Sequence, residues 1–310
     1  MKHLLSIESL SVADIERLVT LGFRLKALRG KPSHPQPLRG QTWALIFGKS
    51  STRTRVSFEV GIRELGGAPL FLGMHDLQLG RGESVEDTAR VLSRYVHGVV
   101  IRTYGQDEVE TFARVGGIPV INALTDDEHP CQILADLMTW AETLAPGPRR
   151  PPLARLLRGK TAVFFGDAAC NVAVSWIFAA ARLGFRLRLA APRAFLPPRV
   201  VLARAQGADV ECFGDPVAAA RGADLLYTDT WISMGKEAEG HRRLKALAPW
   251  QINTRVVRAA KRGAPVMHCL PAYRGKEISA EVFEANAGVI FEQAENRLHL
   301  QKAVLSSLMH

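Results

Sequence analysis

The sequence predicts an α/β protein with two doubly wound parallel-sheet domains. Short apolar runs with strand character alternate with segments of helical periodicity along the chain, and this alternation indicates parallel βαβ units. The stretch at 144–152, LAPGPRRPP, interrupts the alternation, because prolines at this density end a helix and favour extended chain. A chain of 310 residues has room for two ordinary domains, so we place the first at 1–143 and the second at 144–294.

The first half is predicted to begin with a helix capped near Ser11. Ser84, followed by acidic residues, is typical of a second helix N-terminus. The remaining elements follow from apolar periodicity. The expected strands are 42–47, 70–72, 99–103 and 119–122, and the expected helices are 55–65, 84–95, 108–115 and 129–143.

The second half repeats the alternation without repeating the sequence. The expected strands are 161–165, 187–190, 210–212, 225–228, 266–268 and 289–290. The expected helices are 172–183, 199–206, 217–221 and 295–308, the last of them amphipathic.

The composition is that of a globular protein, with 47% hydrophobic and 23% charged residues and no run of 18 apolar residues that would span a membrane. The first residues carry acids and serines where a signal peptide needs an apolar core, so we expect a cytoplasmic protein. The net charge of +10 comes mostly from arginines spread along the chain. This fits anionic small substrates, with nucleic acid as the weaker alternative.

The four cysteines, Cys131, Cys170, Cys212 and Cys269, are scattered without C-x-x-C spacing. Their spacing argues against a zinc site and against a disulfide framework. Cys212 is expected to be an ordinary core residue. The sequence offers no ligand set for a metal, and we expect no cofactor.

The run Ser51-Thr52-Arg53-Thr54-Arg55 lies where an apolar strand passes into a helix. A helix N-terminus presents unpaired N–H groups and a partial positive charge, hydroxyls add donors, and arginine matches phosphate oxygens. The segment therefore predicts a phosphate site. The alternative is an N-cap serine followed by solvated arginines.

Polar clusters lie where five of the other expected strands end. In open α/β sheets ligands bind beyond the carboxyl ends of the strands, so these clusters are candidate site residues. Each has a structural alternative: His129 as a helix cap, Asp229 as an ordinary loop acid, Cys269 as buried filler. The clusters are Arg102, residues 129–132 (HPCQ), Asp167 with Asn171, residues 229–235 (DTWISMG) and residues 268–271 (HCLP).

The motifs STRTR, H-P-x-Q, D-x-x-x-S-M-G and H-C-L-P, in this order and spacing, resemble those of the ornithine carbamoyltransferase family. The likeness spans nearly the whole chain. It implies an enzyme that moves the carbamoyl group of carbamoyl phosphate to the side-chain amine of L-ornithine, giving L-citrulline and phosphate in arginine metabolism. It also implies domains linked by helices, a C-terminal helix (295–310) packed on the first domain, and a homotrimer or an assembly of trimers.

The resemblance assigns roles to individual residues and implies no cofactor. Arg102, His129 and Cys269 would be catalytic, and Gln78 would be lent by a neighbouring subunit. The residues that would bind carbamoyl phosphate are Ser51, Thr52, Arg53, Thr54, Gln78, Arg102, His129, Pro130, Cys131, Gln132, Cys269, Leu270 and Arg297. Those that would bind ornithine are Asn171, Asp229, Ser233 and Met234.

Three positions depart from the pattern of the family. Cys170 stands where Asn is usual, Val174 replaces a polar residue found in some members, and Tyr273 stands where His is common. Two enzymatic alternatives stay open. A carbamoyltransferase could use another amine or amino acid, and a nicotinamide dehydrogenase could use the loop at 163–171, although the G-x-G-x-x-G pattern is missing.

Overall fold

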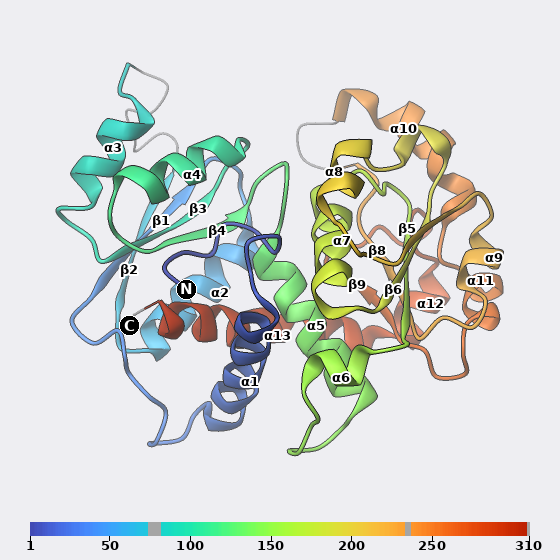
Figure 1. Ribbon diagram of the computed structural model, residues 1–310, viewed down its shortest axis with the longest axis horizontal. Helices are drawn as coiled ribbons and strands as arrows, with labels where there is room; N and C mark the ends of the chain where they lie inside the picture. The colour runs from blue at the N-terminus through green and yellow to red at the C-terminus, as the bar shows by residue number, and fades with distance from the viewer. Residues whose placement is uncertain (74–81, 233–236, 309–310) are drawn as a thin grey trace. The chain divides into compact units, whose positions relative to one another are not determined.

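The structure of the protein is a computed structural model that describes residues 1–73, 82–232 and 237–308. The chain divides into two compact units, Met1–Met138 with Asn296–His310, and Thr139–Glu295. Each unit contains one parallel sheet (Figure 1), as predicted from the alternation of strands and helices. Within the described ranges, no helix is long and apolar enough to cross a membrane.

The sheet of the first unit has the strand order β2-β1-β3-β4. Trp43 on β1 faces Gly98 on β3, and a Cβ at position 98 would lie 2.5 Å from the Trp43 ring, so only glycine fits this register. At the other end Phe47 pairs with Arg102, so the loops after β1 and β3 leave from the same edge. The strands are β1 (Thr42–Phe47), β2 (Ala68–Gly73), β3 (Gly98–Arg102) and β4 (Val120–Leu124).

Helices cover both faces of this sheet (Figure 1). Phe112 and Ala89 pack with Val99 of the sheet on the face covered by α3 and α4. Ser11 caps α1 through a capping box with Asp14, as the sequence predicted. The helices that begin in this unit are α1 (Val12–Leu28), α2 (Thr52–Glu64), α3 (Val85–Leu92), α4 (Gln106–Val115) and α5 (Pro130–Leu144).

The C-terminal helix α13 (Ala287–Ser307) corrects two predictions. The strand expected at 289–290 is wrong, because Ile290 belongs to this helix; a short apolar run fits either structure. The helix is also not amphipathic over its last turns, since residues 297–305 are all buried. Its polar groups have partners in the first unit: Lys302 Nζ lies 2.6 Å from Glu64 Oε2, and Asn296 accepts a hydrogen bond from Lys26. The C-terminal helix thus packs on the first unit, as the resemblance implied.

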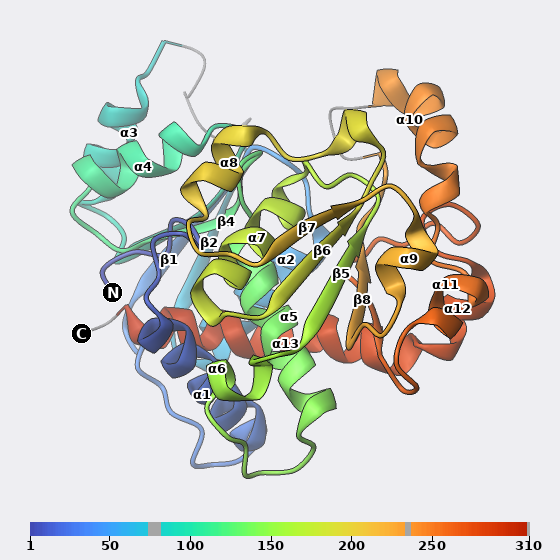
Figure 2. The same ribbon diagram turned by 45° about the vertical axis from the view of Figure 1, so that its right-hand side comes forward.

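The sheet of the second unit has the strand order β7-β6-β5-β8-β9. The strands β7, β6, β5 and β8 are labelled in Figure 2. On one face Trp176, Phe164 and Tyr227 form an aromatic cluster, and on the other Val163, Leu226 and residues of α9, α11 and α12 form the core. The strands are β5 (Thr161–Phe165), β6 (Arg186–Ala190), β7 (Val210–Phe213), β8 (Leu225–Thr228) and β9 (Val266–His268).

In the second unit the helices expected at 172–183, 199–206 and 217–221 correspond to α7, α8 and α9, whereas α6, α10, α11 and α12 were not predicted. The prediction for Cys212 is wrong: it is exposed, because β7 is the last strand at its end of the sheet. The helices are α6 (Leu153–Leu157), α7 (Asn171–Leu183), α8 (Arg199–Arg204), α9 (Pro216–Ala220), α10 (Gly240–Leu247), α11 (Thr254–Ala259) and α12 (Ala280–Ala285), with 3₁₀ turns at Arg193–Phe195, Glu237–Glu239 and Ala248–Trp250.

Candidate active site

The loop between β1 and α2 presents hydroxyl groups at the start of the helix. Ser51 is the N-cap of α2, and its Oγ accepts a hydrogen bond from Thr54 N at 3.3 Å. Thr54 Oγ1 accepts from Ser51 Oγ at 3.0 Å and from Arg297 Nη2 at 2.8 Å. Two accepted bonds occupy the oxygen of Thr54, so its own O–H is left to donate to a ligand.

Three guanidinium groups come together beside this loop. Arg102 and Arg297 are 5% and 4% exposed, and Arg53 is partly buried. Burial, followed by the charges of Arg297 and Arg53, lowers the pKa of Arg102 to about 10, so that it stays cationic at neutral pH. Like charges held together in a buried place repel one another, and a bound dianion removes this repulsion. The cluster is therefore built for an anion such as phosphate.

His129 and Gln132 lie at the start of α5, which follows β4. His129 is 5% exposed, and burial, then Arg297 and Arg102, holds its pKa well below its usual value. The ring is therefore neutral at pH 7 and carries one N–H that can donate to a carbonyl oxygen. Pro130 is the first residue of α5. The thiol of Cys131 is buried, with a pKa raised to about 12 by burial, and donates to Asn122 O at 3.4 Å.

Lys49 is a residue of this region that the sequence analysis did not single out. It is 5% exposed and forms an ion pair with Asp126, and its Nζ lies 4.1 Å from the centre of the Tyr104 ring. Lys49 follows β1, Tyr104 follows β3 and Asp126 follows β4. Through these contacts Lys49 connects the three loops that follow β1, β3 and β4. The sequence could have pointed to Lys49 because it lies two residues before Ser51, next to the predicted phosphate site.

The second unit contains a separate cluster at the carboxyl ends of β8 and β9. Cys269 Sγ donates to Asp229 Oδ1 at 2.8 Å, and Thr230 N donates to the same oxygen at 2.6 Å. Burial raises the pKa of the Asp229 carboxyl. Leu270 has a φ of 58°, a left-handed conformation that is uncommon outside glycine, and its N–H donates to His268 Nδ1 at 2.9 Å. Thiol and carboxylate thus lie in contact, next to a strained backbone.

A buried ion pair between Arg243 and Asp167 holds two loops of this unit. Asp167 was a candidate from the sequence, whereas Arg243 was not predicted. Arg243 on α10 also donates from Nε to Trp231 O at 2.7 Å. Gly166 has a φ of 109°, and a Cβ there would lie 2.7 Å from Trp231 Nε1, so the position requires glycine. Arg243 thereby joins the loop after β5 to the loop that follows Asp229.

The structure also places the three positions that depart from the family pattern. Cys170 is the N-cap of α7, directly before Asn171, and burial, then the charges of Asp229 and Asp167, raises its thiol pKa well above the usual value. Val174 is buried, one turn further along the helix. Tyr273 is 44% exposed and lines a cavity of about 190 Å³ together with Trp231.

The structure divides the predicted site residues into two groups. The first unit holds residues 51–54, 102, 129–132 and 297, and the second holds Asn171, Asp229, Cys269 and Leu270. Gln78, Ser233 and Met234 lie outside the described residues.

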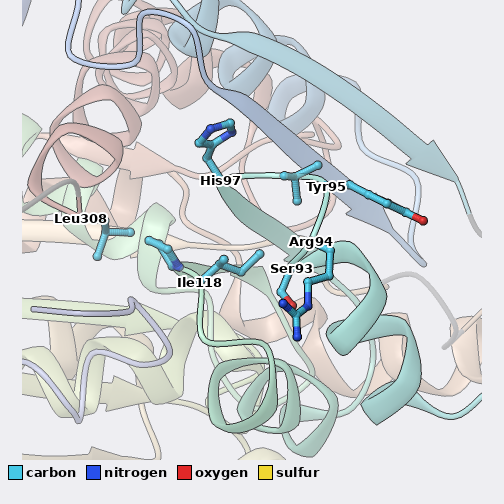
Figure 3. A pocket seen from close by; sticks show the side chains of 8 residues that line it. Ser93, Arg94, Tyr95, His97, Ile118 and Leu308 are labelled. Carbon is cyan, nitrogen blue, oxygen red and sulfur yellow. The ribbon is translucent and has the colours of Figure 1, made fainter.

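The first unit also contains a pocket that none of the described candidate site residues lines (Figure 3). This pocket of about 540 Å³ is lined by residues 93–97, Ile118, Pro119 and Leu308. Residues 93–97 precede β3, and Ile118 and Pro119 precede β4, so the pocket lies at the amino ends of the strands. Ligands of open α/β sheets bind at the opposite ends, which agrees with the candidate site and not with this pocket.

Comparison with known proteins agrees with the two-unit architecture. Residues 2–142 match the aspartate/ornithine carbamoyltransferase carbamoyl-P binding domain, and residues 158–308 match the Asp/Orn binding domain of the same family. An ornithine carbamoyltransferase of Akkermansia muciniphila is 54% identical, over 99% of this chain and 98% of the relative. One from Hydrogenovibrio crunogenus is 46% identical, over 99% and 98%.

Solved structures show the same relationship. The ornithine carbamoyltransferase from Pyrococcus furiosus has a TM-score of 0.91 at 41% identity, covering 99% of this chain and 97% of that chain. The anabolic ornithine carbamoyltransferase from Campylobacter jejuni has a TM-score of 0.89 at 40% identity, covering 99% of each. With both of its domains matched and near full-length relatives at this identity, the chain belongs to the aspartate/ornithine carbamoyltransferase family.

Proposed function

We propose that this protein transfers the carbamoyl group of carbamoyl phosphate to the side-chain amine of L-ornithine, giving L-citrulline and phosphate. The observation that carries the proposal is the cluster of Arg53, Arg102 and Arg297 around the hydroxyls at the start of α2. The family of the chain and the names of its near full-length relatives support the same reaction, and the anabolic neighbour supports a place in arginine biosynthesis.

The first unit has the groups needed to hold carbamoyl phosphate and to help phosphate leave. Guanidiniums and helix N–H groups neutralise the charge that grows on the leaving oxygen. Arg102, neutral His129 and the O–H of Thr54 are donors for the carbamoyl oxygen as it becomes an oxyanion. A preorganised donor of this kind contributes about 3–4 kcal/mol to the stability of a transition state.

The second unit has groups suited to an amino acid. Asn171 at the start of α7 and the carboxylate of Asp229 would hold the α-carboxylate and α-amino groups, together with Ser233 and Met234. Cys269, in contact with Asp229, would orient the attacking amine. A free side-chain amine titrates near ~10.4, so it must lose a proton before it attacks, and the cations around carbamoyl phosphate favour that loss.

The proposal extends to the domains and the assembly. Residues 1–143 with 295–310 would bind carbamoyl phosphate and residues 144–294 would bind ornithine, in a cytoplasmic homotrimer or assembly of trimers that takes Gln78 from a neighbouring subunit. A mixture of Gln78→Ala and Arg53→Ala subunits tests the sharing of sites. Partial recovery of turnover on mixing supports it, and the absence of any recovery contradicts it.

A citrulline assay tests the reaction itself. With carbamoyl phosphate as donor, we expect citrulline from L-ornithine and much slower product formation from aspartate, putrescine or an acylated ornithine. If another amine is carbamoylated faster than L-ornithine, that amine is the acceptor. If none of these amines is carbamoylated by well-folded protein, the proposed function is wrong.

A further inference from the structure

The side-chain amide of Gln132 has two different environments. Gln132 is 1% exposed and lies in the first turn of α5, three residues after His129, whose carbonyl oxygen accepts a hydrogen bond from Gln132 N at 3.0 Å. Its Nε2 donates to Asp136 Oδ1 at 2.7 Å, and Asp136 is fully buried. Its Oε1 is also buried and has no hydrogen-bond partner among the residues that the structure describes.

Asp136 determines which way this amide points. The oxygen and nitrogen of an amide are similar in size, so their hydrogen-bond partners decide between the two orientations. A carboxylate can only accept hydrogen bonds, and therefore it takes the NH₂ group of Gln132. The carbonyl oxygen is turned to the other side, where a buried acceptor without a donor is unfavourable until a ligand supplies one.

The substrate of the proposed reaction offers that donor. Carbamoyl phosphate carries a carbonyl oxygen and an NH₂ group on the same carbon. Arg102, Thr54 and neutral His129 supply donors, which suit the carbonyl oxygen but not the NH₂ group. Gln132 Oε1 is a buried acceptor in the first turn of α5, three residues after His129, which suits the NH₂ group.

We propose that Asp136 is a positioning residue that fixes the amide of Gln132 with its oxygen toward the substrate, and that this orientation selects carbamoyl phosphate over acyl phosphates of the same shape. Acetyl phosphate has a CH₃ group in place of the NH₂ group and leaves Gln132 Oε1 unpaired. This inference rests on the carbamoyl-phosphate half of the proposed function.

Asp136→Asn is the informative change, because asparagine keeps the size of the side chain but can donate as well as accept. Gln132 can then turn over and present its NH₂ group to the NH₂ group of the substrate. We expect the preference for carbamoyl phosphate over acetyl phosphate to fall by about tenfold, which corresponds to about 1.4 kcal/mol.

Calorimetric dissociation constants for carbamoyl phosphate, acetyl phosphate and inorganic phosphate measure this preference in the full chain. Inorganic phosphate has no NH₂ group for Gln132 Oε1 to accept from, so its affinity should not change in Asp136→Asn. Gln132→Ala should lower the preference to a similar degree, and Asp136→Asn should have no further effect in the Gln132→Ala background. The control Asp14→Asn makes the same chemical change in the N-terminal turn of α1 and should leave the preference intact.

Two outcomes overturn the inference: an unchanged preference in Asp136→Asn, or separate and additive losses in the double variant. If Asp136→Asn does not fold, Gln132→Met replaces it. Methionine keeps the length of the side chain but has no amide oxygen to accept from the NH₂ group of the substrate. The preference for carbamoyl phosphate over acetyl phosphate should therefore fall by about tenfold, while the affinity for inorganic phosphate stays unchanged. An undiminished preference in Gln132→Met would equally overturn the inference.

Different experimental results would contradict the proposed function and this inference. Wild-type protein that makes citrulline but binds acetyl phosphate as tightly as carbamoyl phosphate contradicts the inference alone. Wild-type protein that prefers carbamoyl phosphate but carbamoylates none of the amines contradicts the proposed function alone.

Discussion

Arg297 Nη2 donates a hydrogen bond to Thr54 Oγ1 at 2.8 Å, although 243 positions separate the two residues in the sequence. Arginine has only donors, so Thr54 must accept in this contact. The contact joins the C-terminal helix to the first turn of α2, and it places a third guanidinium beside Arg102. The predicted phosphate site therefore depends on a residue from the last part of the chain.

Replacing Arg297 should weaken the binding of carbamoyl phosphate. We expect Arg297→Met to raise KM for carbamoyl phosphate at least tenfold, since a charge-assisted contact with the dianion is lost, and Arg297→Lys to recover part of the affinity. Arg274→Met is the control, because Arg274 is exposed and pairs with Glu284 in the second unit. Steady-state kinetics with ornithine saturating provide the measurement. Equal values of KM for Arg297→Met and the control would rule out this role.

Arg53 should matter much more than its neighbour Arg55. We expect Arg53→Ala to lower turnover by several orders of magnitude, because its charge stabilises the leaving phosphate. Arg55→Ala is the matched control: Arg55 is paired with Glu59 at 2.7 Å and lies 3.6 Å over the Phe71 ring. A loss below about tenfold in Arg53→Ala, or ~1.4 kcal/mol in the activation barrier, would contradict the assignment.

His129 should make the stability of the protein depend on pH. Its pKa is lowered on folding, so below its ordinary value of 6.5 the unfolded chain binds more protons than the folded chain does. The free energy of unfolding should therefore fall as pH drops from 7 to 5, by up to about 1.4 kcal/mol per pH unit from this group. In His129→Gln this part of the loss should vanish. Urea titrations at several pH values compare the two proteins, and parallel curves would contradict a neutral His129.

The contact between Cys269 and Asp229 should affect ornithine and not carbamoyl phosphate. In Cys269→Ala, Asp229 loses a hydrogen bond that stabilises its charged form, so we expect a higher KM for ornithine and lower turnover. The affinity for carbamoyl phosphate should stay close to that of wild type. Cys212→Ala, at an exposed thiol, is the control. Unchanged ornithine affinity and turnover would remove Cys269 from the site.

Removing one partner of the ion pair between Arg243 and Asp167 should destabilise the protein. Both side chains are 5% exposed, so Arg243→Met leaves a buried carboxylate without its cation and should lower the free energy of unfolding by about 3–5 kcal/mol. The double variant Arg243→Met with Asp167→Asn should regain part of this loss, because the unpaired charge is gone. Urea denaturation followed by tryptophan fluorescence measures both. Additive losses in the double variant would show that the two residues act independently.

The strand-end prediction was informative because it depends only on local order. A parallel sheet brings the carboxyl ends of its strands to one edge, so Arg102 at the end of β3 and His129 after β4 could be grouped with residues 51–54 from the sequence alone. The same local reasoning failed for the apolar pair Val289-Ile290, which is equally compatible with a strand and with the first turn of α13.

Local sequence was sufficient to predict the alternation of strands and helices, the cap of α1 at Ser11 and the order of the polar motifs, because these features depend on residues close together in the chain. The pairing of distant charges and polar groups emerged from the three-dimensional fold. Lys49 with Asp126, Arg243 with Asp167 and Arg297 with Thr54 are such pairs. The strength of a charge–charge or hydrogen-bond contact is set by distance and burial in space, and neither can be read from separation along the chain.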